Sequence, residues 1–378
     1  MSKEFEYNLS KASTMSTSIP LVKVAMPPKD RLIPRLEEVL YGGMIAEGEH
    51  VYRFESEFAR TFRLPLALGT SSGTGALHIA LLLANTVPGD EIITTSMTAE
   101  PTNTVILQCG ARPVFADIDP QTGNLDPMSV EELVTPLTRA IVVVHYAGFP
   151  ADLNALRRIA DQHGIALIED CAHALGAEYD GHGIGTIGDY AIFSLQAIKH
   201  MTTLDGGILT MRNANKLPEA RKLRWFGMTK GVPRTEVDIT QLGFKYNMNN
   251  VAGIIGLTQL ETIEDRISRH IDNGRFFERE ISKISGLNVS RVDLECQPSY
   301  WLFTVLSDNS NAIERCLYNV GVSASKLHRP NHYHSIFESM RRPMPGLETY
   351  YRRLTHIPCG WWVSNEDRER IVETLRKG

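Results

Sequence analysis

Seven short apolar runs mark residues 65 to 211, and segments with helical spacing separate several of them. The runs are rich in Val and Ile, which favour strands. The clearest helical segment is residues 151–164, where apolar side chains from Leu153 to Ala160 recur on one face and a glycine ends the pattern. We predict strands at residues 65–70, 91–96, 112–118, 140–145, 165–170, 189–195 and 206–211.

The predicted strands are apolar throughout rather than alternating, which is typical of a parallel sheet buried on both faces. Their separation by helices favours an α/β fold. Ligands of such sheets bind at the carboxyl ends of the strands, so polar residues that follow a strand are the first candidates for a site.

The last third of the chain has a different pattern. A long helical pattern runs from about Asn250 to Ile284, and a strand-like run at 298–306 and a helix at 365–377 follow it. We therefore expect two domains and place their boundary near the long helix. The expected division is a flexible N-terminal arm at 1–20, a large domain at 21–255 and a smaller α+β C-terminal domain at 256–378.

Composition narrows the class of protein without identifying it. The 378 residues are 43% hydrophobic and 22% charged, as in an ordinary soluble globular protein. The net charge of −5 lacks the basic footprint of a nucleic-acid partner. No apolar run approaches the roughly 18 residues of a membrane helix, so no membrane partner is expected.

The N-terminus and the cysteines bear on location. The first twenty residues are rich in Ser and Thr and lack the apolar block of a secretory signal. The cysteines are odd in number and form no C-x-x-C pair, which favours a reducing cytoplasm over a disulfide framework or a structural zinc site. They are Cys109, Cys171, Cys296, Cys316 and Cys359.

Three motifs suggest other chemistries. The sequence GIGTIG at 183–188 matches a dinucleotide fingerprint, but it precedes a strand and opens no helix, so a glycine turn is the better interpretation. His328, His332 and His334 could suggest a metal site, although no carboxylate or cysteine at supporting spacing accompanies them. A polar surface or a loop near a substrate explains them more simply.

Cys171 and His173 lie two residues apart and could suggest a nucleophilic thiol. A turn or helix is predicted to begin at this point, so nothing in the sequence brings the two side chains into contact.

The strongest constellation joins Asp170, Lys199 and a phosphate cradle. Asp170 ends one predicted strand and Lys199 closely follows another, so both reach the same rim if the strands are parallel. A lysine with a lowered pKa can form a Schiff base, and a carboxylate can hold a ring nitrogen protonated; together they meet the needs of pyridoxal 5′-phosphate. The turn that precedes a helix from about Gly75 supplies N–H groups for a phosphate, and Ser194 is a second donor. The turn consists of Ser72, Gly73, Thr74 and Gly75.

The order and spacing of these pieces resemble the DegT/DnrJ/EryC1/StrS family of nucleotide-sugar aminotransferases. The resemblance runs from about residue 20 to the end and includes FESEFARTF, SSGTGALHIAL, GDEIITTSMT, HGIALIEDCAHALGAEYDGHGIGTIGDYAIFSLQAIKHMTTLDGGIL and LGFKYNMNN. It implies an aspartate-aminotransferase-like fold of type I, with a mostly parallel seven-stranded sheet, and a homodimer with shared active sites.

The resemblance also implies roles for single residues. Lys199 matches the lysine that links to pyridoxal 5′-phosphate and moves the proton, and Asp170 matches the partner of the pyridine nitrogen. His173 stands beside the coenzyme ring. The implied phosphate donors are Gly73, Thr74 and Ser194, together with Asn247 and Lys245 of the second subunit.

The implied reaction is transamination of a nucleotide-linked keto sugar with L-glutamate as donor. Segments 328–334 and 360–371 resemble members that act on 4-keto-6-deoxyhexoses. Trp361 and Trp362 in the second segment suit either a sugar pocket or a core.

Two departures from the family pattern stand out. Ala99 lies by count where many members carry an aromatic residue that stacks on the coenzyme, and TTLDGG replaces the common TTGEGG through Leu204 and Asp205. Some members have His in place of the lysine and are deoxysugar dehydratases; Lys199 favours transamination here. A dehydratase on the same scaffold, a non-enzymatic sensor of sugar nucleotides and, from GIGTIG alone, a nicotinamide oxidoreductase are the alternatives.

Overall fold

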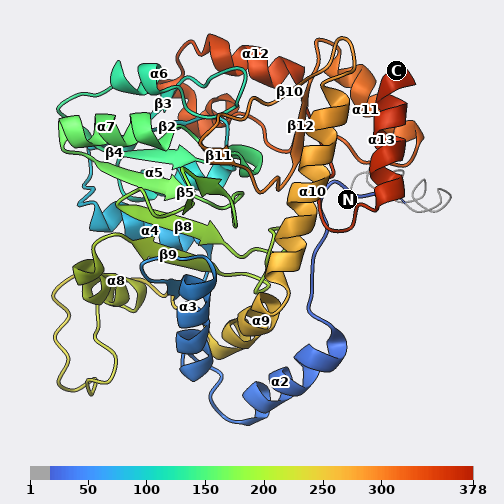
Figure 1. The fold of residues 1–378 in the computed structure, drawn as a ribbon. Coiled ribbons are helices and arrows are strands. Elements are labelled where there is room, and N and C mark those ends of the chain that lie inside the picture. The colour runs from blue at the N-terminus through green and yellow to red at the C-terminus, as the bar shows by residue number, and fades with distance from the viewer. Residues whose placement is uncertain (1–17, 378) are drawn as a thin grey trace, which may run out of the picture.

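The computed structural model describes residues 18–377, and its centre is a seven-stranded, mostly parallel sheet (Figure 1). Residues 1–17, which make up most of the expected arm, and residue 378 lie outside the described residues. The strand order is β1-β9-β8-β5-β4-β2-β3. The strands are β1 (Leu68–Thr70), β2 (Glu91–Thr95), β3 (Arg112–Ala116), β4 (Thr138–Val144), β5 (Ala166–Asp170), β8 (Tyr190–Ser194) and β9 (Gly207–Met211).

Five neighbouring strands, from β8 to β3, are parallel, as the sequence predicts. Strand β9 is antiparallel to both of its neighbours, β8 and β1. The segment between β8 and β9 contains no helix, and a parallel return needs a crossover of a dozen or more residues, usually helical. The chain therefore reverses directly, and Lys199 lies in this reversal.

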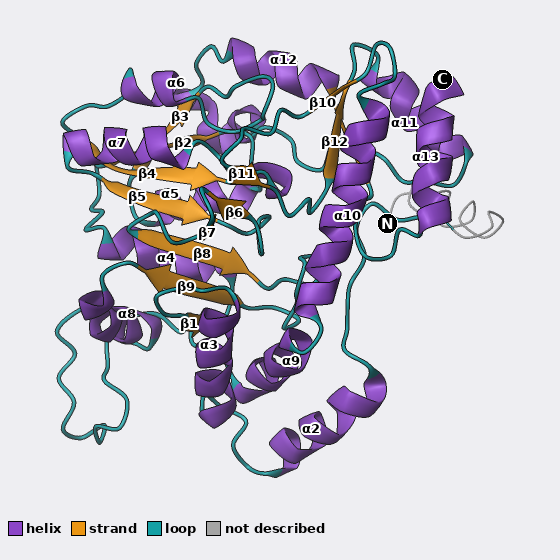
Figure 2. Cartoon of the chain, in the orientation of Figure 1, coloured by secondary structure: helices purple, strands orange, loops and turns teal. Residues whose placement is uncertain are grey.

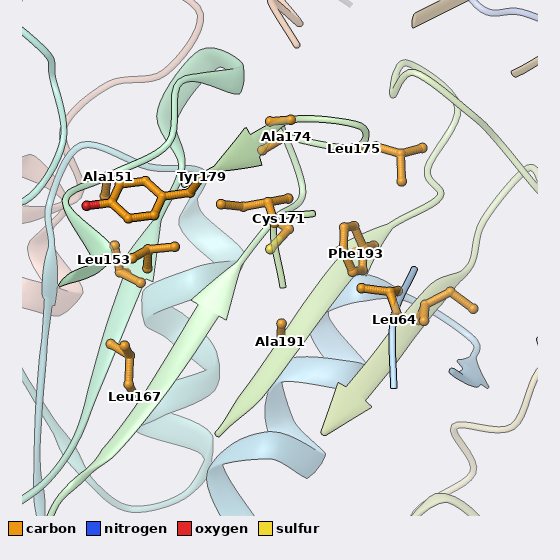
Figure 3. Close-up of a cluster of buried hydrophobic side chains, with 14 of the residues drawn as sticks. Leu64, Ala151, Leu153, Leu167, Cys171, Ala174, Leu175, Tyr179, Ala191 and Phe193 are labelled. Carbon is orange, nitrogen blue, oxygen red and sulfur yellow. The ribbon is translucent and has the colours of Figure 1, made fainter. Parts of the chain in front are cut away.

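Successive residues of the central strands belong to different hydrophobic clusters on the two faces of the sheet. Ile93, Ile141 and Leu167 pack on one face with residues of α3, α7, α9 and α10. Ile92, Val142 and Ile168 pack on the other with residues of α4, α5 and α8. Figure 3 shows part of the first cluster, with Leu167 on β5 and Phe193 on β8. Both faces are thus buried, which explains the continuous apolar runs.

Helices cover the sheet and continue into the C-terminal part (Figure 2). The first seven are α2 (Lys29–Tyr41), α3 (Glu49–Thr61), α4 (Gly73–Leu83), α5 (Glu100–Gln108), α6 (Pro127–Glu131), α7 (Leu153–His163) and α8 (Leu217–Arg224). The remaining five are α9 (Asn250–Leu260), α10 (Ile263–Ile281), α11 (Ser310–Asn319), α12 (Pro345–Arg353) and α13 (Asn365–Lys377). Among residues 18–377, none of the helices has the length and apolar character needed to cross a bilayer.

A small antiparallel sheet lies beside α10 and has the order β10-β12-β13. Its strands are β10 (Asn288–Val289), β12 (Phe303–Leu306) and β13 (Leu354–Ile357). A third sheet, β11-β6-β7, joins Cys296–Gln297 to Glu178–Tyr179 and His182–Gly183. A third hydrophobic cluster packs Phe303 and Leu354 of the small sheet with Phe115 of β3 and with Tyr146, which lies just after β4.

Three sequence predictions need correction at the level of elements. The helix expected over 250–284 is two helices, because the backbone of Thr262 leaves the helical region (φ −133°, ψ 9°). The strand expected at 298–306 begins only at Phe303, because Tyr300 takes a left-handed conformation (φ 48°). Strand β1 begins at Leu68 rather than 65.

Candidate active site

A cavity of about 350 Å³ lies where β5, β8 and the N-terminus of α4 meet. Asp170 ends β5 and Ser194 ends β8, and both line the cavity. Because β5 and β8 are parallel neighbours, their carboxyl ends reach the same rim, as the sequence predicts. Lys199 follows β8 in the chain reversal and also lines the cavity.

Burial controls the charge of Lys199. It lowers the pKa of the ammonium to about 8, although the carboxylate of Asp170 acts in the opposite direction. Among the described residues, Lys199 has no ion-pair partner within 4.0 Å. A lysine so placed is partly neutral near pH 8, which a nucleophilic amine requires.

Asp170 is held by two hydrogen bonds. Oδ2 accepts from the Thr102 hydroxyl (2.9 Å) and Oδ1 accepts from the Ala172 N–H (3.1 Å). Burial raises the pKa of this carboxyl, against the two donors and the nearby Lys199. The side chain is therefore fixed in direction, and a cationic partner in the cavity would favour its charged form.

A phosphate-sized cradle forms where α4 begins. The Ser72 hydroxyl caps the helix by accepting from the Gly75 N–H (2.9 Å), which leaves the first N–H groups of α4 without partners inside the helix. A Cβ on Gly73 would lie 3.0 Å from the Ser194 Cβ, so a larger residue would have to push Ser194 away from the cradle. Gly73, Thr74 and Ser194 thus face the cavity together, and a helix N-terminus favours an anion there.

His173 lines the cavity with its ring stacked on Trp301, at 4.1 Å between ring centroids. Burial, with Lys199 as the next cause, lowers the pKa of His173 well below its usual range, so the imidazole is neutral. Its Nδ1 is buried without a hydrogen-bond partner in the described chain. This orphaned nitrogen indicates a polar ligand.

Asn247 and Lys245 do not line this cavity. The Lys245 ammonium donates to the Asn247 Oδ1 (2.7 Å), and Asn247 forms a β-bridge with Thr70. Their expected contribution from a second subunit is therefore still a prediction.

GIGTIG wraps a buried carboxylate. Glu169 accepts from the N–H groups of Gly185, Ile187 and Gly188 at 2.5–3.0 Å and from His145 Nε2 at 3.2 Å. The glycines let the backbone close around a side chain, so the nicotinamide alternative has no structural basis here. His145, Glu169 and Cys171 are the one metal-like cluster among residues 18–377, yet Glu169 already has four donors.

The three histidines of residues 328–334 lie in different places. His328 lines the cavity, parallel to His173 with 5.5 Å between ring centroids. His332 is buried against the Ser96 hydroxyl (2.7 Å), and His334 lies 3.7 Å from Glu100. The interpretation as a loop near the site is the one that the geometry supports.

Cys171 belongs to the hydrophobic cluster on the face of the sheet, as Figure 3 shows, whereas His173 faces the cavity. Burial raises the pKa of the Cys171 thiol well above its usual range. A nucleophilic Cys–His pair is therefore excluded. Trp361 and Trp362 do not line the cavity either; the Trp362 indole N–H donates to the Pro20 carbonyl (2.9 Å).

Sequence reasoning missed two residues of the site, Thr102 and Trp301 behind Lys199, and it placed His328 in a loop near a substrate without assigning it to the cavity. Thr102 lies in the first turn of α5, shortly after the carboxyl end of β2. Polar residues close to a strand end are site candidates, so this position could have identified it. Trp301 is far away in the sequence and within a predicted strand, so no local signal marked it. Ala99 lines the cavity as expected, and the rings among the lining residues are those of His173 and His328.

Leu204 has a left-handed backbone (φ 74°). It stands where many family members carry glycine, and its side chain is 54% exposed. The loop thus keeps a conformation that suits glycine, at some cost in strain.

A sequence profile of the DegT/DnrJ/EryC1/StrS aminotransferase family matches residues 28–376. The chain belongs to this family. The spore coat polysaccharide biosynthesis protein SpsC of Bacillus subtilis is 32% identical over 362 residues, which cover 91% of this chain and 93% of SpsC.

Solved structures of two proteins are similar over nearly the whole chain. The sugar aminotransferase CalS13 of Micromonospora echinospora is 35% identical with a TM-score of 0.92 and covers 95% of this chain and 100% of its own. AtS13 of Actinomadura melliaura is 35% identical with a TM-score of 0.93, over 96% and 99% of the two chains. These findings confirm the predicted family and fold class.

The protein is thus a sugar aminotransferase whose coenzyme is pyridoxal phosphate. The residues of the cavity fit this coenzyme. A glycine-lined helix N-terminus suits the phosphate. The His173 Nδ1 could bind a polar group of the coenzyme, and the partly neutral amine of Lys199 could bind its carbonyl carbon. Asp170 offers a fixed carboxylate to a ring nitrogen.

Proposed function

We propose that this enzyme transfers the amino group of L-glutamate to a nucleotide-linked keto-deoxysugar, with a 4-keto-6-deoxyhexose as the substrate class. The observation that carries the proposal is the convergence of Lys199, Asp170 and the α4 N-terminus on one cavity. Segments 328–334 and 360–371 resemble family members that use 4-keto-6-deoxyhexoses. SpsC takes part in polysaccharide biosynthesis, which supports a role for the amino sugar in a glycan.

Pyridoxal phosphate, when bound, supplies an aldehyde that links to amines and a ring that withdraws electrons from the carbon being deprotonated. Lys199 would bind the aldehyde through Nζ and, once released, hold and move the proton at that atom. Its pKa of about 8 suits a group that must both accept and donate a proton near neutral pH.

Asp170 would hold the ring nitrogen in its protonated form, and Thr102 and Ala172 keep the carboxylate pointing at it. Gly73, Thr74 and Ser194 would bind the phosphate. His173 would contact the ring through its neutral imidazole. These contacts orient the coenzyme while its amine partner changes.

A homodimer completes the proposal. Tyr41 and Leu242 are 85% exposed and Met44 is 64% exposed, so these segments leave large apolar side chains uncovered. A second copy packed against these segments would bury them and bring Asn247 and Lys245 toward the neighbouring phosphate cradle. All five cysteines are free, in keeping with the reducing cytoplasm that we propose as the location.

The substrate can be tested with a panel of keto-sugar nucleotides and isotopically labelled L-glutamate, followed by mass spectrometry. We expect the label to appear in one 4-keto-6-deoxyhexose nucleotide. The Lys199→Ala variant should transfer none, and the surface variant Lys216→Ala should transfer at the wild-type rate. Loss of water from the sugar without incorporation of label would identify a dehydratase and contradict the proposal.

A further inference from the structure

We propose that Trp301 is a positioning residue whose indole face holds the ammonium of Lys199. The indole thereby favours the protonated form of the free lysine, which burial alone would disfavour. The inference builds on the proposed function, because it concerns the lysine that carries the coenzyme. It adds a residue that does not line the cavity and has no part in the roles described above.

The contact itself has the geometry of a cation–π interaction. The Lys199 Nζ lies 4.0 Å from the centroid of a Trp301 ring, and the Trp301 side chain is 1% exposed. A desolvated ammonium over an indole is the strongest form of this interaction. His173 stacks on the same indole at 4.1 Å and 22° between planes, so Trp301 orients two groups of the site together.

The indole is fixed by bonds between two distant segments. The Trp301 Nε1 donates to the Ile198 carbonyl (3.0 Å), next to the lysine in sequence. On the other side of the lysine, His200 Nε2 lies 3.2 Å from the Ser299 carbonyl. Residues 198–200 and 299–301 are therefore tied together on both sides of Lys199.

Two more contacts tie the 299–301 turn to its surroundings. The Tyr300 carbonyl is 2.9 Å from His270 Nδ1 of α10. A Cβ on Gly148 would lie 2.7 Å from the Trp301 N, so the backbone of the large sheet's loop approaches as closely as glycine permits. The left-handed backbone of Tyr300 (φ 48°) persists because these contacts determine it.

Other groups that face Lys199 do not replace the indole. Asp170 is the one charged partner that raises the pKa of Lys199, and it lies beyond ion-pair distance among the described contacts. His173, His200 and His328 are kept neutral, since burial lowers the pKa of each. Trp301 is thus the remaining group able to favour the cation, while burial opposes it.

The test measures the pKa of Lys199 in the coenzyme-free protein by competitive acetylation, read by mass spectrometry on the peptide that contains Lys199. Trp301→Met fills the space without a ring, and Trp301→Phe keeps a weaker aromatic face. Trp362→Phe is the matched control, because it loses a similar indole N–H bond, to the Pro20 carbonyl, and Trp362 does not line the cavity. We expect the pKa to fall by about one unit in Trp301→Met and by less in Trp301→Phe. It should be unchanged in the control.

An unchanged pKa in Trp301→Met, or a rise toward that of a solvated lysine, would overturn the proposal, since the indole would then act only as a plug against water. If Trp301→Met does not fold by near-ultraviolet circular dichroism, Trp301→Phe must still lower the pKa more than Trp362→Phe does. In the coenzyme-loaded Trp301→Met enzyme, the acid limb of the kcat profile should also move to lower pH. Because the titration uses apo-protein, it stands even if the proposed substrate is wrong.

Discussion

Burial sets the protonation of the side chains around the cavity more than ion pairing does. Lys199 is pushed toward its neutral amine and His173 toward its neutral imidazole, in both cases chiefly by desolvation. Attack on an aldehyde requires the neutral amine. The rate at which apo-protein captures pyridoxal phosphate should therefore rise with pH, with a midpoint near 8 set by Lys199.

Stopped-flow absorbance over a pH series measures this capture, with a peptide lysine as the control. The pKa of Lys199 lies below its ordinary value, so the neutral form is already accessible near pH 8 and is lost as pH falls through that value. A midpoint close to that of the peptide, above pH 10, would contradict the buried position of Lys199.

Asp170 gives the second prediction at this scale. Asp170→Asn keeps the shape of the side chain but removes its charge, so a protonated ring nitrogen loses its partner. We expect kcat to fall about 100-fold or more while coenzyme still binds. Thr102→Val, which removes one donor to Asp170, should cost about 10-fold. Steady-state kinetics with coenzyme-saturated enzyme measures both, and a near-normal rate in Asp170→Asn would refute the assigned role.

At the scale of elements, the GIGTIG loop depends on one carboxylate. Glu169 is fully buried and receives three backbone N–H groups and His145. Glu169→Gln replaces an acceptor with a donor facing these N–H groups. We expect a loss of about 2–4 kcal/mol in the free energy of unfolding. Urea denaturation measures it, and Glu178→Gln, on a half-exposed strand nearby, should change stability by less than about 0.5 kcal/mol.

The elements that the sequence predicted well are those whose signal is local. Strands β2, β4, β5 and β8 are buried on both faces, so each contains adjacent apolar residues, and α13 begins and ends at the predicted residues. The break between α9 and α10 has no glycine or proline to mark it. Within the site, Asp170 and Ser194 could be placed because they end strands. Trp301 could not, since its position depends on contacts between segments about 100 residues apart.

At the scale of the whole molecule, the large sheet and the C-terminal part of the chain pack together around the cavity. A single hydrophobic cluster joins Phe115 and Tyr146 to Phe303 and Leu354. Asn331 also donates to the carbonyls of Ser96 and of Thr98, which lines the cavity. The backbone of Ile19 also pairs with Gly321 and Ser323, so the described start of the chain is held on the C-terminal part. The proposed domain boundary therefore separates two sheets, but the two parts pack into one continuous hydrophobic cluster.

The proposed sharing of each active site between two subunits predicts complementation between two inactive variants. Lys199→Ala and Asn247→Ala should each be inactive or nearly so. In a mixed dimer, one of the two sites combines an intact Lys199 with an intact Asn247 from the other subunit. Refolding the two variants together in equal amounts should restore about one quarter of the wild-type activity. No recovery, with mixed dimers shown to form by native mass spectrometry, would mean that Asn247 does not act across the interface.

The most direct test of the central claim is chemical mapping of the coenzyme. Borohydride reduction of the loaded enzyme should fix pyridoxal phosphate on a single peptide that contains Lys199, and Lys199→Arg should leave that peptide unmodified. We expect this adduct, together with the loss of visible absorbance in Lys199→Arg. An adduct on another lysine, or none in an enzyme that still transfers the amino group, would contradict it.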